Sequence, residues 1–153
     1  MTQNIFVKIS GDLIDNEQVS RWIAECSKRG KLVICVGGGT QINNALVEAG
    51  IPIREHGPLG REHQSEKERM IAEEILVKNV EKVRALCREQ KINCEVVAPL
   101  IEVGGVQCHI NGDQIILAAY LGYDQLFVLT TADRVEKKES EFAQYPKIKV
   151  VGF

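Results

Sequence analysis

The sequence predicts an α/β fold, a three-layer sandwich with a mainly parallel central sheet. Three observations lead to this prediction: short apolar segments rich in Val and Ile, amphipathic segments between them, and glycine turns where the first two apolar segments end. Strands buried on both faces are apolar at nearly every position. Strands that alternate with helices are typical of a parallel sheet with helices on its faces.

The predicted strands are apolar along most of their length and are bounded by turn-forming or charged residues. Two adjacent glycines, Gly104 and Gly105, fit the turn of a hairpin in addition to these strands. The five predicted strands are residues 4–9 (NIFVKI), 31–36 (KLVICV), 94–99 (CEVVAP), 124–130 (DQLFVLT) and 147–153 (KIKVVGF).

The predicted helices show apolar residues at helical spacing between a polar start and a polar or glycine end. We expect Asp15 or Asn16 to cap the first helix and Thr40 to cap the second. The longest helix is predicted from about Ser65 to Gln90. The four predicted helices cover residues 17–29, 41–50, about 65–90 and 112–122.

Length and composition indicate one domain over residues 1–153. The net charge of −2 gives no electrostatic case for binding nucleic acid or an anionic membrane. No apolar run approaches the ~20 residues that cross a bilayer, and residues 1–10 lack the layout of a signal peptide, so we expect a cytoplasmic protein. The five cysteines contain no C-x-x-C pair, so we expect free thiols and no zinc site.

Two glycine turns follow the first two predicted strands. The first strand ends in VKISGD, with Lys8, Ser10 and Gly11, and the second ends in VGGGT, with glycines at 37–39. Backbone N–H groups in such turns hold anionic oxygens, and a lysine neutralises developing charge. The pattern therefore favours a phosphate-binding site, with ordinary tight turns as the alternative. It is neither a Walker motif nor G-x-G-x-x-G.

A third segment, NGDQIILAAYLGYDQLFVLTTADRV, runs from a helix start at Gly112 and Asp113 into a strand that ends at Thr130. The three segments in this order resemble the amino acid kinase family, which includes acetylglutamate, aspartate, carbamate, isopentenyl phosphate and uridylate kinases. The Ser-Gly form of VKISGD is closest to uridylate kinase. The resemblance covers nearly the whole chain and implies the fold of that family.

The resemblance also implies ATP-dependent phosphoryl transfer, with Mg²⁺, to a carboxylate or phosphate group of a small acceptor. It assigns Lys8 to the phosphate oxygens, Asp113 to ordering the lysines, and Arg54 or Arg61 to the acceptor's carboxylate. A homodimer or higher oligomer is implied as well. The residues implied to bind phosphate or nucleotide are Ser10, Gly11, Gly37, Gly38, Gly39, Thr40, Thr130, Thr131 and Asp133.

The sequence departs from the family pattern at two points. Arg134 stands where a glycine usually lets the backbone approach the nucleotide. The sequence ends at Phe153, before the family segment that completes the adenine pocket and supplies a second lysine, so we expect a short form. We expect the late lysines to form a solvated surface; these are Lys137, Lys138, Lys147 and Lys149.

Two functions stay open from the sequence. One is a minimal kinase, and the other is a non-catalytic relative that binds a nucleotide or phosphorylated metabolite or serves as a subunit of a larger assembly. Lys8 also has two interpretations, a phosphate contact or an edge-of-sheet lysine that reaches solvent. We expect His56, His63 and His109 to be surface residues and not metal ligands.

Overall fold

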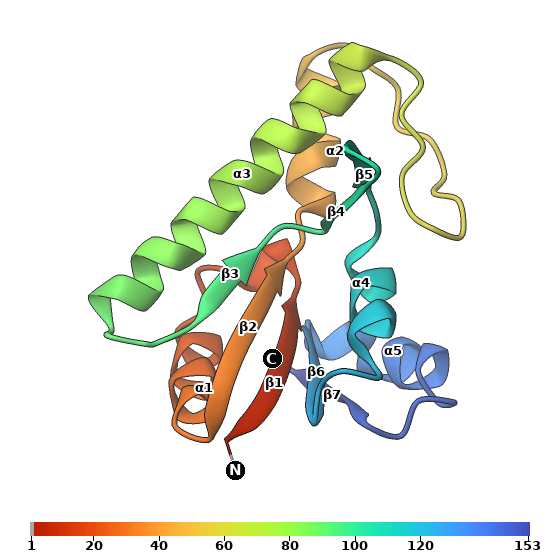
Figure 1. Cartoon of the computed structure of the whole chain (residues 1–153). Coiled ribbons are helices and arrows are strands. Elements are labelled where there is room, and N and C mark those ends of the chain that lie inside the picture. Colours follow the sequence, from red (N-terminus) through yellow and green to blue (C-terminus); the bar gives the residue numbers. More distant parts are fainter. Residues whose placement is uncertain (1) are drawn as a thin grey trace.

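The computed structural model describes residues 2–153 and contains a five-stranded parallel sheet with helices on both faces (Figure 1). This confirms the predicted three-layer α/β fold. The strands lie in the order β3-β2-β1-β6-β7. Their bounds are β1 (Gln3–Ile9), β2 (Gly30–Val36), β3 (Glu95–Val97), β6 (Gln125–Thr130) and β7 (Ile148–Gly152).

Helices α1 (Glu17–Ser27) and α3 (Glu66–Glu89) pack on one face of the sheet, and α4 (Gly112–Ala119) packs on the other. Helix α5 (Val135–Glu141) lies beside α4 (Figure 1). Successive strand residues point to opposite faces. In β1, residues 5, 7 and 9 face α1 and α3, while residue 6 faces α4. Lys8 therefore lies on the α4 face.

Lys8 belongs to the central strand of the sheet. Strand β1 pairs with β2 on one side and β6 on the other, and Lys8 lies in register with Cys35 and Val128. Its side chain is only 12% exposed. The edge-of-sheet interpretation of Lys8 is therefore wrong, because strand order places two strands on either side of β1.

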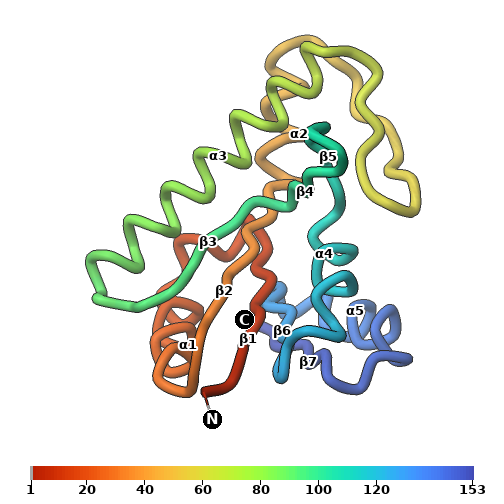
Figure 2. The backbone as a smooth tube through the Cα atoms, viewed as in Figure 1, coloured from red at the N-terminus to blue at the C-terminus, as the bar shows by residue number. Residues whose placement is uncertain are grey.

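A second group of elements lies beyond the carboxyl ends of β1 and β2 (Figures 1 and 2). It comprises α2 (Gly39–Glu48), the segment 49–65, and an antiparallel hairpin of β4 (Leu100–Val103) and β5 (Val106–His109). Gly104 and Gly105 form the hairpin turn with φ values of 58° and 79°, a conformation that favours glycine. These elements cover the edge of the sheet where the glycine turns emerge.

Of the two predicted helix caps, the one at Asn16 is confirmed and the one at Thr40 is wrong. Asn16 caps α1 and Ser65 caps α3 through their side-chain oxygens. The predicted Thr40 cap is wrong: α2 starts at Gly39, and the Thr40 hydroxyl donates to Asp12 Oδ2 at 3.2 Å. No side chain caps α2, so the amides of its first turn are left for another partner.

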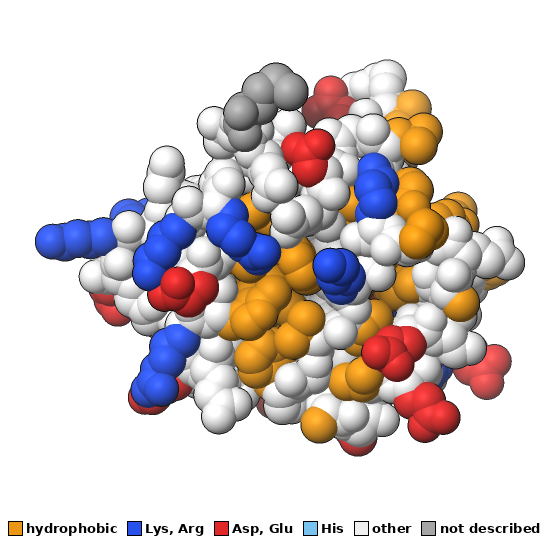
Figure 3. All heavy atoms as spheres, turned by 90° about the horizontal axis from the view of Figure 1, so that it is seen from below, with side chains coloured by type: hydrophobic (Ala, Val, Ile, Leu, Met, Phe, Trp, Pro, Cys, Tyr) orange, Lys and Arg blue, Asp and Glu red, His pale blue; other side chains and the backbone are white. Residues whose placement is uncertain are grey.

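The opposite end of the molecule, seen from below, mixes basic and acidic side chains around exposed hydrophobic ones (Figure 3). Across residues 2–153, no helix combines the length and the apolar character that crossing a bilayer requires. All five cysteines are free thiols in the described chain.

Candidate functional site

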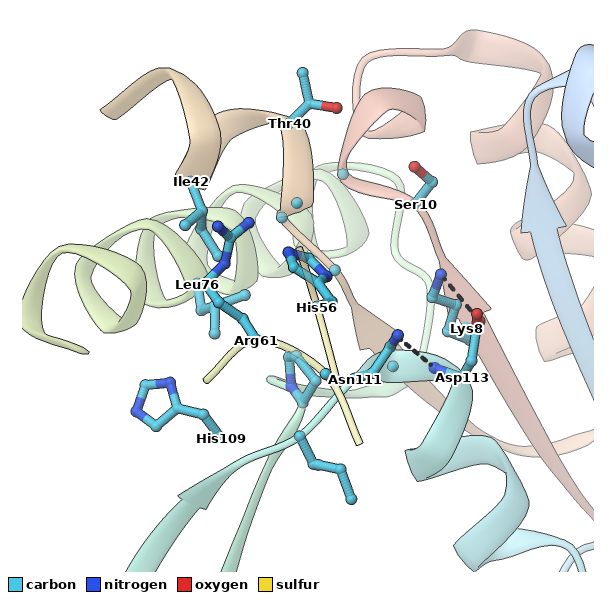
Figure 4. Close-up of a pocket in the computed structure, with 18 of the residues that line it drawn as sticks. Lys8, Ser10, Thr40, Ile42, His56, Arg61, Leu76, His109, Asn111 and Asp113 are labelled. Atoms are coloured by element: carbon cyan, nitrogen blue, oxygen red, sulfur yellow. Dashed lines mark hydrogen bonds and ion pairs between the residues drawn. The ribbon is translucent and has the colours of Figure 1, made fainter. Parts of the chain in front are cut away.

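A cavity of about 220 Å³ lies at the carboxyl ends of the central strands (Figure 4). It is lined by residues 10–12 after β1, residues 37–40 at the β2–α2 junction and Thr130 at the end of β6. Ligands of open parallel sheets bind at this edge, where neighbouring connections leave in opposite directions. Strands β2 and β6 flank β1 on opposite sides, so the sheet topology positions the cavity.

The two glycine loops lie side by side, as predicted. The Gly37 amide donates to Ile9 O at 3.0 Å, and Gln41 Nε2 donates to Gly11 O at 2.8 Å. A Cβ atom on Gly11 would lie 2.8 Å from Gly37 O, so only glycine permits this approach. A Cβ atom on Gly39 would have no neighbour within 4 Å, so this side of the loops is open.

Two lysines share one carboxylate at the far wall of the cavity. Lys8 Nζ lies 3.4 Å from Asp113 Oδ1, and Lys138 Nζ donates to Asp113 Oδ2. The three side chains are 12–16% exposed. The contact of Lys8 lacks hydrogen-bond geometry, so Oδ1 is buried without a hydrogen-bond donor among residues 2–153. Lys138 also donates to Glu141 Oε2 at 3.2 Å.

The two lysines keep Asp113 ionised. Burial by itself would raise the pKa of Asp113, but Lys8 and Lys138 outweigh burial and hold that pKa below its usual value. Burial likewise opposes the charge on Lys138, yet Asp113 and Glu141 raise the Lys138 pKa. The cluster therefore sets two lysines against two carboxylates, Asp113 and Glu141.

The start of α4 positions this cluster. Asn111 caps the helix by accepting from the Asp113 amide at 3.1 Å, which places Asp113 in the first turn. A Cβ atom on Gly112 would lie 2.7 Å from Lys8 Cε. Glycine at position 112 therefore lets the lysine side chain pass the helix start and reach the carboxylate.

Most of the predicted site residues line the cavity. Arg61 lines it, whereas Arg54 lies outside and pairs with Glu68 at 3.4 Å. Thr131 and Asp133 also lie outside its lining. The predicted residues that line the cavity are Lys8, Ser10, Gly11, Gly37, Gly38, Gly39, Thr40, Arg61, Asp113 and Thr130.

The late lysines do not all form a solvated surface. That expectation is wrong for Lys138 and for Lys147, which is half-buried and donates to the carbonyl oxygens of Tyr120 and Tyr123. Helix α5 turns one face toward α4. Lys138 lies on that face and lines the cavity, whereas Lys137 is 77% exposed. No motif in the sequence marks Lys138, which lies within α5 shortly after the segment TTADRV. Arg134 also lines the cavity, with Nη1 3.8 Å from Asp12 Oδ2.

The expectation of surface residues holds for His56, which is exposed, and is wrong for His63 and His109, which are half-buried. His56, His63 and His109 line the cavity, although His56 is largely exposed. Backbone contacts carry the segment 49–65 to this position: Asn111 N donates to Leu59 O at 2.8 Å. These contacts join residues far apart in the chain, and the sequence carried no signal for them.

No family model and no curated protein matches the chain. Solved structures do. N-acetylglutamate synthase from Neisseria gonorrhoeae, complexed with coenzyme A and N-acetyl-glutamate, matches 86% of this chain with a TM-score of 0.65 and 17% identity. The smu.665 protein from Streptococcus mutans UA159 matches 90% with a TM-score of 0.58 and 19% identity. Isopentenyl phosphate kinase matches 97% with a TM-score of 0.50 and 12% identity.

The parallel sheet, its helices and these similarities show that the chain has the amino acid kinase fold, as the resemblance of its motifs implied. The chain spans 42% of the first synthase chain and 44% of a second one, complexed with coenzyme A and L-arginine. It spans 82% of the smu.665 chain and 90% of the isopentenyl phosphate kinase chain.

Proposed function

We propose that this chain is an ATP-dependent phosphotransferase that acts on a carboxylate or phosphate group of a small acceptor. One observation carries the proposal: Lys8 and Lys138 converge on the buried Asp113 in a cavity that both glycine loops line. The proposal treats residues 1–153 as one kinase-like domain. It also includes a cytoplasmic location, which rests on the apolar pattern of the sequence, and a homodimer or higher oligomer, which rests on the family resemblance.

Phosphoryl transfer needs positioning and charge stabilisation more than covalent chemistry. The uncapped amides at the start of α2 and the glycine loops supply N–H donors for phosphate oxygens. The ammonium groups of Lys8 and Lys138 neutralise negative charge on the transferring group. Asp113 holds both ammonium groups and does not itself react. Thr130, Thr131 and Asp133 are assigned to the nucleotide side.

The residues fit the triphosphate of ATP, because the side of the loops at Gly39 is open and two lysine ammonium groups lie at the wall of the cavity. Among residues 2–153, no group of three or more His, Cys, Asp or Glu is arranged to hold a metal ion. Magnesium would therefore be held mainly by the phosphates and by water, and when bound it would neutralise charge on the phosphate oxygens.

The alternative is a binding protein without turnover. The ion pair between Arg134 and Asp12 favours it, because Arg134 stands where the family has a glycine. A nucleotide or phosphorylated metabolite would then occupy the same cavity. The two functions differ in whether ADP forms.

The test is an ADP-release assay with Mg-ATP and a panel of acceptors that includes acetylglutamate, aspartate and UMP. Lys8→Ala and Lys138→Ala should each lower kcat by at least ~100-fold, the scale of losing one donor to developing charge. Lys137→Ala is the matched control, because this neighbouring lysine is 77% exposed. Its ion pair with Glu141 is long, with 4.0 Å between Nζ and Oε1.

Turnover that survives both Lys8→Ala and Lys138→Ala would refute the assigned site. If the wild-type protein binds ATP but forms no ADP with any acceptor, the binding-protein alternative is correct.

A further inference from the structure

Asn79 is a buried polar side chain on α3, a helix whose buried residues are mostly apolar. It is 8% exposed and is one of three buried polar or charged residues in the described chain, with Glu68 and Thr130. Leu76, three residues earlier on α3, lines the cavity and lies across it from Lys8 (Figure 4). Burying an amide is costly unless it forms hydrogen bonds, so the partner of Asn79 indicates its role.

That partner is the first glycine of the second glycine loop. Asn79 Nδ2 donates to Gly37 O at 3.0 Å. The backbone holds the peptide planes on either side: the Gly37 amide donates to Ile9 O at 3.0 Å, and Gly38 O accepts from the Ile42 amide at 2.8 Å. These backbone bonds leave the plane between Gly37 and Gly38 free to turn, and Asn79 holds it.

The orientation of this plane decides which atom faces the cavity. In a trans peptide the carbonyl oxygen and the following N–H point in opposite directions, and the described chain has no cis peptide. Asn79 draws the Gly37 carbonyl toward α3, so the Gly38 N–H points away from α3, toward the side of Lys8. Among residues 2–153 this N–H donates no hydrogen bond, and Gly38 lines the cavity. The N–H is therefore left for a ligand.

Glycine on both sides allows this plane to turn over. The turn changes only the ψ of Gly37 and the φ of Gly38, and neither residue has a Cβ atom to oppose it. In the present orientation a Cβ atom on Gly38 would lie 2.9 Å from Asn79 Nδ2 and 3.3 Å from Leu76 Cδ2. With the plane turned over, a carbonyl oxygen would face the cavity and repel an anion. The donor on α3 thus selects the orientation in which the loop attracts one.

We propose that Asn79 is a positioning residue for an anion: it holds the Gly37–Gly38 peptide with its N–H toward the cavity, and this N–H binds a phosphate oxygen. That the anion is the phosphoryl group of a substrate rests on the proposed function, but the orientation of the peptide does not. Backbone donors stabilise an oxyanion best when they need no rearrangement on binding. Asn79 fixes the donor from outside the cavity, because its side chain does not line it.

NMR titration of the whole chain with inorganic pyrophosphate tests the proposal. In the wild type the Gly38 amide proton should shift downfield on binding, because its N–H gains a charged acceptor. Asn79→Leu keeps a branched side chain of similar shape and leaves the Gly37 carbonyl without its donor. It should weaken binding about tenfold or more, the scale of one hydrogen bond to a charged group, and most of the Gly38 shift should be lost.

Asn79→Asp reverses the polarity at the same position. A carboxylate repels the Gly37 carbonyl and accepts from the Gly38 N–H, so it should turn the peptide over. The Gly38 proton should then lie downfield without pyrophosphate and should not move during the titration. Binding should be weaker than in Asn79→Leu, because a carbonyl oxygen now faces the anion.

Val83→Ala is the matched control for a loss of stability. Val83 lies one turn further along α3, is 3% exposed and does not line the cavity. Its truncation should lower Tm, because it leaves a void in the core, but the affinity for pyrophosphate should stay at the wild-type value.

Four results would overturn the proposal: no binding of pyrophosphate by the wild type, a Gly38 proton that does not move when the wild type binds, wild-type affinity in both Asn79→Leu and Asn79→Asp, or an equal loss of affinity in Val83→Ala. Absence of ADP formation with Mg-ATP would refute only the proposed function, because the titrations contain no nucleotide.

Discussion

Replacing Asp113 with asparagine should destabilise the protein by removing the one anion that both buried lysines contact. At 3.4 Å and an effective dielectric constant of about 20, the attraction between Lys8 and Asp113 is about 5 kcal/mol, before the cost of desolvation. Breaking a buried ion pair typically costs about 3–5 kcal/mol. We expect about 3 kcal/mol, the lower end, because the side chains keep 12–16% of their exposure.

A loss of about 3 kcal/mol lowers the Tm of a chain of this size by roughly 6–12 °C, which differential scanning calorimetry at pH 7 would measure. Asp133→Asn is the matched control: it makes the same chemical change at a residue outside the cavity. Its Tm should stay close to that of the wild type.

The pH dependence gives a second readout. The pKa of Asp113 is lower in the folded protein, so its contribution to stability is present above the unfolded pKa of about 3.9 and is lost as pH falls through the folded value. The stability difference between wild type and Asp113→Asn should therefore stay constant from pH 7 to pH 5 and shrink in acid. An unchanged Tm for Asp113→Asn at pH 7 would refute the reasoning.

Three further predictions follow from the glycines and cysteines. Gly39→Val should weaken phosphate or nucleotide binding at least tenfold in a titration, and it should leave Tm unchanged because its Cβ meets open space. Gly38→Val should weaken binding and also lower Tm, because its Cβ would lie 2.9 Å from Asn79 Nδ2. Gly112→Ala should displace Lys8 and lower kcat in the ADP assay by more than its change in Tm accounts for. A normal kcat would contradict the close packing, in which a Cβ atom at position 112 would lie 2.7 Å from Lys8 Cε. Mass spectrometry after alkylation without reductant should find five modified thiols, and a stable disulfide would contradict the free state of the cysteines.

The sheet was predictable from the sequence because its strands are short, apolar and separated by amphipathic helices. The glycine loops were predictable for a related reason, since carboxyl ends of parallel strands meet at one edge. The central place of Lys8 was not, because strand order depends on the crossover from α4 into β6 and not on any local pattern.

Lys138 and the histidines escaped prediction for a different physical reason. A lysine in the run VEKKESE has the composition of a solvated helix, and only the docking of α5 beside α4 separates Lys138 from Lys137. His63 and His109 meet through tertiary contacts of a polar segment with a hairpin. The predicted Thr40 cap is wrong because the Thr40 hydroxyl donates to Asp12, which belongs to another loop.

The position of Lys8 in a strand that is covered on both faces limits how the chain can change in length. One residue inserted or deleted within β1 before Lys8 would turn its side chain to the face of α1 and α3, because strand side chains alternate. The neighbours on that face are apolar, including Ile34 and Leu129, and offer no carboxylate in place of Asp113. Strand β1 should therefore accept many apolar substitutions but no single-residue insertion.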